Sequence, residues 1–517
     1  MNSNDIQFFL GKQQIKVSSC SPTLTLLNYL RTEMDLPGTK EGCAEGDCGA
    51  CTVVLVELND GKLTYKAVNA CILFLPMLDG KQVLTVEHLK SDNGLLHPVQ
   101  QAMVDSHASQ CGFCTPGIAM SGYALYQNTR HSKTPESELN QNYQACQNTS
   151  EQTDCLNKTF AGNLCRCTGY GPIIESAKSF IQHALENQTT IELENANLIK
   201  QLESIAPTKE KSFTHAAQTF IQPSNITELN QALDAKPSAH LLAGATDLGL
   251  WVTKQRKNLE TLIYLGQVPE LKQITETDNY IELGASVTYS EALPILSKYF
   301  SQMEGYLERH SSTQIRNSGT VVGNIANGSP IGDIPPPLIA LGSSIKLTSV
   351  HGSRELLLED YFIRYGKQDR KSNEFIEKVR IPIKHKGSFS LYKISKRFEQ
   401  DISSVSAAFY LELTDNIISS IRLCYGGMAA TPLRAKQTET ELLGKPLNEE
   451  TINQACLKLS EDYQPLSDFR ASQVYRMTVA KNLLRKFFIE QSATVNNSTN
   501  SNNIPIQILH TGELKHA

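Results

Sequence analysis

The sequence has no long hydrophobic run, little excess charge of either sign and no recognisable leader segment. A membrane-spanning helix needs about 20 consecutive apolar residues, and no segment of this chain approaches that length. The 48 basic and 53 acidic residues leave a formal charge of −5, whereas nucleic-acid-binding proteins present a basic surface. The N-terminus lacks the basic stretch and apolar segment of a secretory signal. We therefore expect a cytoplasmic protein that binds neither nucleic acid nor membrane.

Cysteine, by contrast, is abundant and unevenly placed. Eleven of the 13 cysteines lie in the first 167 residues. In a reducing compartment such crowding indicates metal binding or catalysis rather than disulfides. The length of 517 residues predicts three to four domains at about 150 residues each. A content of 40% apolar and 20% charged residues is that of folded domains.

Residue patterns predict a multidomain α+β protein that begins with a small ferredoxin-like β-grasp domain over residues 1–90. Apolar runs separated by turn signals predict its strands, and a Ser-Pro-Thr start predicts a helix from Leu24 to Leu30. Strands are expected at 6–10, 15–17, 52–58, 63–68 and 83–86. The order strand, strand, helix, strand, strand is typical of a ferredoxin-like sheet.

The rest of the chain divides into five segments by its hydrophobic pattern. Helical spacing comes first and is interrupted by a polar stretch, which we interpret as a surface insertion. Strand and helix signals then alternate before a final α+β region and a tail rich in Asn and Ser. The predicted segments are a helical domain at 91–188 with an insertion at 128–157, a linker at 189–211, a mixed domain at 212–386, a C-terminal domain at 387–491 and a disordered tail at 492–517.

The first cysteine quartet consists of Cys43, Cys48, Cys51 and Cys71. Three thiols on one short loop, with a fourth from a separate element, match the plant-type ferredoxin spacing for a 2Fe-2S cluster. Glycines within the loop allow tight turns and let backbone N–H groups face the cluster sulfides. A structural zinc site also uses four cysteines, but zinc knuckles usually take two Cys-x2-Cys pairs. The spacing therefore predicts an iron–sulfur cluster.

The second cysteine quartet consists of Cys111, Cys114, Cys165 and Cys167. Each pair precedes a predicted helix that carries a proline, Pro116 or Pro172, in its first turn, where proline is well tolerated. The N-termini of these two helices would then converge on one site, where their dipoles favour an anionic group. On spacing alone zinc competes with an iron–sulfur cluster, and the neighbouring first quartet favours a second electron carrier. Cys146 and Cys155 are interpreted as free thiols.

Two loops in the 212–386 segment are candidates for binding a dinucleotide. No Gly-x-Gly-x-x-Gly motif follows a predicted strand, so the sequence does not support a Rossmann domain. One of the two loops, at 319–330, has small side chains that could admit a flat ring. Asp333 follows this loop, and its alternative role is that of a helix cap. The other loop would let backbone N–H groups approach a pyrophosphate, and it comprises Leu241, Leu242, Ala243, Gly244, Ala245, Thr246, Asp247 and Leu248.

The motifs around the second quartet resemble the molybdenum hydroxylases, in particular the xanthine dehydrogenase branch with its aldehyde oxidases. The matching motifs are Gln-Cys-Gly-Phe-Cys-Thr-Pro-Gly at 110–117 and Gly-Asn-Leu-Cys-Arg-Cys-Thr-Gly-Tyr at 162–170. In that family a plant-type and a helical 2Fe-2S domain follow one another in this order. The resemblance implies that the helical cluster lies nearer the molybdenum cofactor and that Gln110 contacts the pterin. The gap from Cys114 to Cys165 is longer than we expect for the family.

The flavin half resembles the p-cresol methylhydroxylase-like FAD domain of the same enzymes, followed by their α+β C-terminal flavoprotein domain. The resemblance implies that residues 241–248 hold the pyrophosphate of FAD. It also implies FAD contacts from Thr320, Val321, Val322, Gly323, Asn324, Asp333, Ile376 and Lys393. No residue is assigned a catalytic acid–base role, because the cofactors carry the redox chemistry.

The resemblance further implies that a second chain completes the reaction. We expect an iron–sulfur/FAD small subunit of the xanthine dehydrogenase type, joined to a molybdopterin-binding large subunit in a heterotetramer of two small and two large subunits. Electrons from hypoxanthine or xanthine would pass through both clusters to FAD and then to NAD. A related hydroxylase acting on an aldehyde or an N-heterocycle is the alternative enzyme. A zinc-stabilised scaffold with a flavin-like domain is the non-enzymatic alternative.

Overall fold

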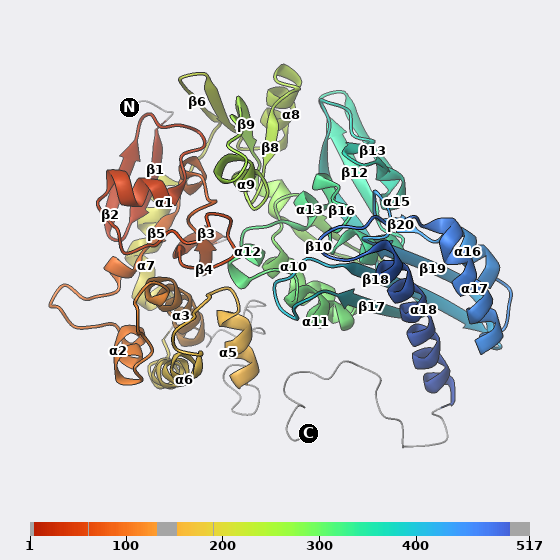
Figure 1. Cartoon of the computed structure of the whole chain (residues 1–517). Coiled ribbons are helices and arrows are strands. Elements are labelled where there is room, and N and C mark those ends of the chain that lie inside the picture. The colour runs from red at the N-terminus through yellow and green to blue at the C-terminus, as the bar shows by residue number, and fades with distance from the viewer. Residues whose placement is uncertain (1–4, 60, 132–151, 190, 497–517) are drawn as a thin grey trace. The chain divides into compact units, whose positions relative to one another are not determined.

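Figure 1 shows the computed structural model, which describes residues 5–59, 61–131, 152–189 and 191–496. The chain divides into two units, which are described separately below. The first unit comprises Met1–Glu270, Thr288–Pro294 and Ser311–Thr320, and the second comprises Leu271–Val287, Ile295–His310 and Val321–Ala517. Within the described ranges, no helix is both long enough and apolar enough to cross a bilayer.

The first unit begins with a five-stranded sheet in the order β2-β1-β5-β3-β4. Its strands are β1 Ile6–Leu10, β2 Gln13–Val17, β3 Thr52–Asn59, β4 Lys62–Asn69 and β5 Gln82–Leu84. β1 pairs antiparallel with β2 across the predicted turn and parallel with β5. The short helix α1, Leu26–Asn28, is continued by a π-helical turn and buries its leucines in the core of this sheet. The predicted ferredoxin-like sheet is therefore confirmed.

A helical segment follows this sheet in the first unit. The helices are α2 Pro98–Asp105, α3 Thr115–Arg130, α5 Gln152–Phe160, α6 Gly171–Glu186 and α7 Ile191–Ile205. In α6 the buried residues recur at helical spacing, as in Ile173, Ala177, Ile181 and Ala184. This periodicity places one apolar face against the core. The helices expected before and after the insertion are therefore present.

Three predictions need correction where helices extend into segments expected to be irregular. α5 overlaps the predicted insertion and buries Leu156 and Phe160, while α7 lies in the predicted linker and buries Leu202. Helix α18 reaches Asn496 and so takes the first residues of the predicted tail. In α5 and α7, a few apolar residues at helical spacing are enough to stabilise the helix, because they pack against a neighbouring core. Residues 132–151 and 497–517 lie outside the described residues.

The interpretation of Cys155 as a free thiol is wrong, because the structure holds this residue in a disulfide. The cysteines at 20, 424 and 456 are free and buried. Cys146 lies outside the described residues. Spacing along the chain does not reveal which thiols meet in space, since a disulfide depends on the distance between two Cα atoms rather than on their separation in sequence.

A four-stranded sheet completes the first unit, in the order β6-β7-β9-β8. Its strands are β6 Lys211–His215, β7 Gln218–Gln222, β8 His240–Leu242 and β9 Thr261–Tyr264. β7 and β8 both run parallel to β9, and parallel strands require crossover connections. The crossovers carry helices α8 Ile226–Ala235 and α9 Leu248–Thr253. Helix α12, Thr313–Arg316, belongs to the same unit, and α10, Tyr289–Tyr299, passes from this unit to the second.

The second unit contains a five-stranded sheet in the order β10-β11-β16-β12-β13. Its strands are β10 Ile274–Glu276, β11 Tyr280–Gly284, β12 Ser344–Ser349, β13 Gly352–Leu357 and β16 Phe375–Pro382. A small hairpin pairs β14, Phe362–Arg364, with β15, Lys367–Gln368. The helices of this region are α11 Gln302–Glu308, α13 Val321–Asn327, α14 Pro335–Ala340 and α15 Leu358–Tyr361.

The second unit ends in an antiparallel sheet in the order β17-β18-β19-β20, with three helices (Figure 1). The strands are β17 Ser388–Ile394, β18 Val405–Thr414, β19 Ile417–Gly426 and β20 Leu433–Arg434. The helices are α16 Lys436–Leu442, α17 Glu449–Asp462 and α18 Gln473–Asn496. Phe487 of α18 packs edge-on against Phe409 of β18, with ring centroids 5.3 Å apart. The predicted multidomain α+β fold class is confirmed.

Candidate functional site

The first cysteine quartet converges at one end of the ferredoxin-like sheet. Cys43 and Cys48 lie on the loop before β3, Cys51 stands at the start of that strand, and Cys71 follows β4. The side chains of Cys43, Cys48 and Cys71 lie next to one another, and that of Cys51 lies next to that of Cys71. The structure therefore brings together all four cysteines that the spacing singled out.

Backbone N–H groups of this loop donate hydrogen bonds to cysteine sulfur. The N–H groups of Asp47 and Cys48 each donate to Cys43 Sγ at 3.3 Å. Gly46 and Gly49 adopt positive φ angles of 80° and 68°, a region that glycine enters without steric cost. Four cysteine sulfurs are the ligand set of a 2Fe-2S cluster, and backbone N–H groups that face sulfur offset its negative charge, so this loop fits an iron–sulfur cluster.

The second quartet is built from two loops, each leading into a helix. Cys111 and Cys114 precede α3, and Cys165 and Cys167 precede α6. The side chain of Cys111 lies next to that of Cys167, and that of Cys114 lies next to that of Cys165, so each neighbouring pair takes one cysteine from each loop. A 2Fe-2S cluster takes four cysteine ligands, and the four thiols fit that donor set. Across the described residues, no three His, Cys, Asp or Glu side chains surround a single metal-ion position.

Polar groups next to the second quartet hold its cysteines in place. Thr168 Oγ1 lies 3.2 Å from Cys165 Sγ, and the N–H of Cys165 donates to the Tyr170 hydroxyl at 2.8 Å. Tyr170 adopts a left-handed conformation with φ of 69°, which turns the chain sharply into α6. Gln110, the predicted pterin contact, is exposed beside Cys111. Cys111 and Cys167 are exposed as well, whereas Cys165 is buried.

The loops of the two quartets touch within the first unit. The N–H of Leu164 donates to the carbonyl of Cys48 at 2.9 Å, and Asn163 Nδ2 donates to the carbonyl of Gly49 at 3.1 Å. A Cβ placed on Gly117 of α3 would lie 2.2 Å from the Gly49 oxygen, far inside contact distance. Glycine at 117 is therefore required for this close approach.

A buried polar network joins four segments of the first unit next to these loops. Gln314 Nε2 donates to Ser121 Oγ at 3.1 Å and to Asn163 Oδ1 at 3.0 Å. Ser121 Oγ donates to Asn163 Oδ1 at 2.6 Å, and Asn163 Nδ2 reaches Thr52 at 3.2 Å. Sequence analysis missed this network. Its members are polar residues without a motif, and only the tertiary fold brings them together.

The predicted pyrophosphate loop, 241–248, connects β8 to α9 in the first unit. Leu242 and Ala245 are buried, and Ala245 adopts a positive φ of 61°. A Cβ on Gly244 would lie 1.7 Å from the backbone oxygen of Ser318. Burial raises the pKa of Asp247. Thr320 is buried in the same unit and forms a β-bridge with Thr288.

The remaining predicted FAD contacts lie in the second unit. Val321, Val322, Gly323 and Asn324 stand on α13, and Ile376 is buried on β16 opposite Leu347 of β12. Asn324 Oδ1 is buried and has no hydrogen-bond partner among the described residues. An orphaned buried acceptor of this kind is costly unless a bound group satisfies it. This orphaned atom fits a polar ligand such as FAD.

Asp333 and Lys393 form a buried ion pair in the second unit. Lys393 Nζ lies 2.6 Å from Asp333 Oδ2, and their side chains are 1% and 6% exposed. Ser403 Oγ donates to Asp333 Oδ1 at 2.6 Å, and His310 Nδ1 lies 2.9 Å from Oδ2. Burial alone would raise the pKa of Asp333, but the Lys393 ammonium and the His310 hydrogen bond hold it well below its usual range. Sequence analysis named Asp333 and Lys393 and missed His310 and Ser403.

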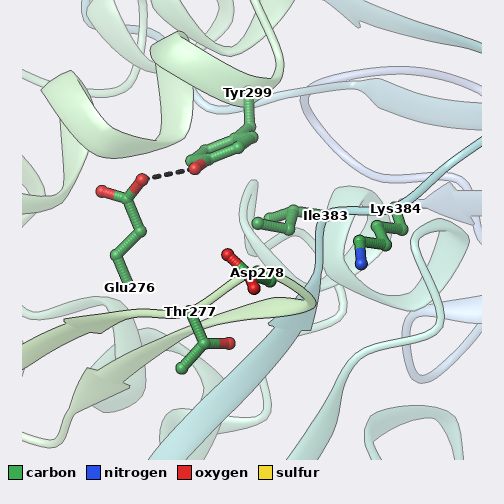
Figure 2. A pocket seen from close by; sticks show the side chains of 6 residues that line it. All are labelled: Glu276, Thr277, Asp278, Tyr299, Ile383 and Lys384. Carbon is green, nitrogen blue, oxygen red and sulfur yellow. Dashed lines mark hydrogen bonds between the residues drawn. The ribbon is translucent and has the colours of Figure 1, made fainter.

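A polar cavity of about 560 Å³ lies elsewhere in the second unit (Figure 2). Glu276 at the end of β10 lines it, as do Thr277 and Asp278 in the turn that follows, together with Tyr299, Ile383 and Lys384. The Tyr299 hydroxyl and Lys298 Nζ both donate to Glu276. The carboxylate of Glu276 is therefore already neutralised by the protein's own groups. None of the predicted site residues lines this cavity.

Three family models match successive parts of the chain. Residues 85–178 match the 2Fe-2S binding domain, residues 212–384 match the FAD binding domain in molybdopterin dehydrogenase, and residues 390–491 match the CO dehydrogenase flavoprotein C-terminal domain. Together with the two quartets, these domains define an iron–sulfur flavoprotein. The chain belongs to the molybdenum hydroxylase family, of which it carries the iron–sulfur and FAD-binding domains.

Proteins similar to this chain include xanthine dehydrogenases and an aldehyde oxidase. Xanthine dehydrogenase/oxidase of Gallus gallus is 28% identical over 99% of this chain and 42% of its own length. Xanthine dehydrogenase 1 of Arabidopsis thaliana is 30% identical over 92% of this chain and 39% of its own length. Aldehyde oxidase 1 of Bos taurus is 30% identical over 95% of this chain and 39% of its own length. The chain thus spans about two fifths of the length of these relatives.

A solved structure shares the fold of part of the chain. The crystal structure of quinoline 2-oxidoreductase from Pseudomonas putida 86 matches 54% of this chain and 99% of its own chain. The TM-score is 0.50 at 24% sequence identity. At this level of identity the match concerns the fold alone.

Proposed function

We propose that the chain is the iron–sulfur/FAD electron-transfer subunit of a xanthine dehydrogenase. A partner molybdopterin subunit would oxidise hypoxanthine or xanthine, and Cys111, Cys114, Cys165 and Cys167 would hold the cluster that accepts its electrons. Cys43, Cys48, Cys51 and Cys71 would hold the second cluster, which would supply electrons to FAD and so to NAD. The supporting observation is the direct contact between the two quartet loops, through the hydrogen bond from Leu164 to Cys48.

The chain's own residues hold the carriers rather than react with substrate. Iron–sulfur clusters and a flavin supply the redox chemistry when bound, and the protein supplies their spacing, hydrogen bonding and charge. The thiols of each quartet are the proposed cluster ligands. Residues 241–248 are proposed to hold the pyrophosphate, and Thr320 to Asn324, Asp333, Ile376 and Lys393 are proposed to contact FAD. The orphaned Asn324 Oδ1 and the buried Asp333–Lys393 pair support this assignment.

The surface around the second quartet is suited to receive the partner subunit. Cys111 and Cys167 are exposed, and Phe113 and Leu164 beside them are about half exposed, at 48% and 47%. Apolar side chains exposed around functional groups mark interaction sites. We propose that the molybdopterin subunit covers this face and that Gln110 contacts the pterin. A complex of two small and two large subunits is part of this proposal.

A related hydroxylase is the second candidate. The similarity to aldehyde oxidase 1 is as high as that to xanthine dehydrogenase 1, at 30% identity in both cases. Substrate selection belongs to the partner subunit, so an aldehyde or an N-heterocycle would use the same electron path through this chain.

The decisive experiment is purification of the native complex followed by a substrate panel. The protein should be coloured, contain iron and FAD, and reduce NAD when given xanthine or hypoxanthine. Reduction of NAD with an aldehyde or an N-heterocycle, but not with xanthine, would establish the second candidate. A colourless protein that contains zinc instead of iron and flavin would contradict both enzyme assignments.

Substitution of Cys165 by serine is expected to remove one of two iron–sulfur EPR signals from the reduced protein. Serine shortens the ligand and replaces the thiolate that a cluster requires. The reciprocal variant, Cys71→Ser, should remove the other signal and retain the first. The measurement is low-temperature EPR after dithionite reduction, together with iron content. An unchanged pair of signals in Cys165→Ser would show that this residue is not a cluster ligand.

A further inference from the structure

Helix α9 connects the proposed flavin pyrophosphate loop directly to the first cysteine quartet. It begins at Leu248, where the loop ends, and its last turn reaches the loop that carries Cys43. Thr253 Oγ1 donates to the carbonyl of Ala44 at 2.7 Å. Lys254 Nζ, directly after the helix, donates to the carbonyl of Cys43 at 2.8 Å. Neither residue belongs to a motif identified in the sequence.

We propose that Lys254 raises the reduction potential of the cluster held by the first quartet, and that Thr253 positions the quartet loop on α9. The inference rests on the proposed function, because it requires a cluster at Cys43. Reduction adds one negative charge to the cluster. A fixed cation next to a ligand residue stabilises the reduced form more than the oxidised form. Hydrogen bonding, charge and exposure are the features by which a protein sets cluster potentials.

Glu45 opposes this effect and limits its size. Its carboxylate lies 3.4 Å from Lys254 Nζ, and the two side chains are 39% and 44% exposed. Water and salt screen charges at such sites, so we expect a moderate effect that weakens as ionic strength rises. The opposite sign of Glu45 provides an internal check, because removal of its charge should shift the potential in the opposite direction to removal of the Lys254 charge.

Lys257 provides a matched control. It lies only three residues beyond Lys254, but its ammonium stands over the ring of Trp251 at 4.3 Å from the centroid. Lys257→Met therefore removes the same charge and a similar side chain from the same segment. Because Trp251 rather than the cluster loop receives the Lys257 ammonium, this variant should leave the cluster potential close to that of the wild type.

The experiment is an EPR-monitored redox titration of the purified holoenzyme. In Lys254→Met we expect the ratio of reduced to oxidised first-quartet cluster, at a fixed potential near the midpoint, to fall about threefold. This equals about 28 mV at 59 mV per tenfold change for a one-electron couple. Lys254→Arg should restore the wild-type value, and Glu45→Gln should raise the ratio. The signal assigned to the second quartet should keep its midpoint in every variant.

The outcomes separate the inference from the proposed function. Two intact EPR signals with an unchanged first-quartet midpoint in Lys254→Met would overturn the role of Lys254. A downward shift in Glu45→Gln would overturn the electrostatic explanation, even if Lys254→Met did not fold. Absence of iron–sulfur signals from the wild-type holoenzyme would instead contradict the proposed function. Thr253→Val removes the hydrogen bond to Ala44 without changing any charge. The reduction midpoint of the first-quartet cluster in this variant should therefore depend on salt concentration as it does in the wild type.

Discussion

Substitution of Asp333 by asparagine is expected to destabilise the second unit by about 3–5 kcal/mol, because it leaves the Lys393 ammonium buried without a counter-charge. Lys393 is 1% exposed, so water cannot replace the carboxylate. The loss should appear as a lower midpoint of thermal unfolding and as a lower FAD content. Lys393→Met should be comparably damaging, since it leaves the Asp333 carboxylate unpaired.

The double variant Asp333→Asn/Lys393→Met separates the ion pair from other roles of these residues. Both charges are then absent, so the double variant should be considerably more stable than the sum of the two single losses predicts. FAD content should remain low if both residues contact FAD, as proposed. Strictly additive losses in the cycle would contradict a direct interaction between the two side chains.

The contribution of Asp333 to stability should disappear in acid. Its pKa in the folded protein is held below the ordinary value by Lys393 and His310, so below about pH 4 the unfolded chain binds more protons than the folded one. The stabilisation is therefore complete above the unfolded pKa and is lost as pH falls through the folded pKa. Unfolding measured between pH 3 and 7 should show a stability gap between wild type and Asp333→Asn that is constant above about pH 4 and narrows below it. A gap that stayed constant would show that charge does not explain the stabilisation.

Substitution of Gly244 by alanine is expected to abolish FAD binding and to retain both iron–sulfur clusters. The added Cβ would lie 1.7 Å from the oxygen and 2.4 Å from the carbonyl carbon of Ser318. These are backbone atoms, so the loop at 241–248 or the chain at Ser318 must move. Overpacking of this kind typically costs about 1–3 kcal/mol. Flavin absorbance relative to iron content of the purified protein is the measurement.

Gly305→Ala is the matched control for Gly244→Ala. Gly305 lies inside α11, and beyond its chain neighbours and the backbone of its own helix no heavy atom lies within 4 Å of the Cβ position. Alanine favours a helix over glycine by up to about 1 kcal/mol, so this variant should bind FAD normally and be slightly more stable. Normal flavin content in Gly244→Ala would show that the close contact with Ser318 is not needed for the cofactor.

Local pattern was sufficient to predict the elements whose signals are repetitive. The strands of the first sheet have apolar runs with turn residues between them, and α6 carries its buried residues at helical spacing. The cysteine quartets could also be identified from the sequence, because proteins hold 2Fe-2S clusters with few residue types at restricted spacings. Helices α5 and α7 were not predicted, because their sequences are mostly polar. Their few apolar residues stabilise a helix only when they pack against the core.

The partners of the side chains around the sites could not be predicted from local pattern. The contacts of Lys254 with Cys43, of His310 with Asp333 and of Gln314 with Asn163 join residues that are 211, 23 and 151 positions apart. A lysine, a histidine or a glutamine is compatible with many surroundings, so its sequence neighbours do not indicate its partner. The contact exists only after separate elements have packed.

The sequence by itself predicted the two cysteine quartets, the order of the domains and the main elements, because these depend on residue type, spacing and hydrophobic period. The tertiary structure alone decided which cysteines of the second quartet lie side by side, that the two quartet loops touch at Leu164 and Cys48, and that Asp333 is buried against Lys393. Those properties depend on distances between remote segments and on exclusion of water. Both are consequences of packing, which acts on the whole fold rather than on any short stretch of chain.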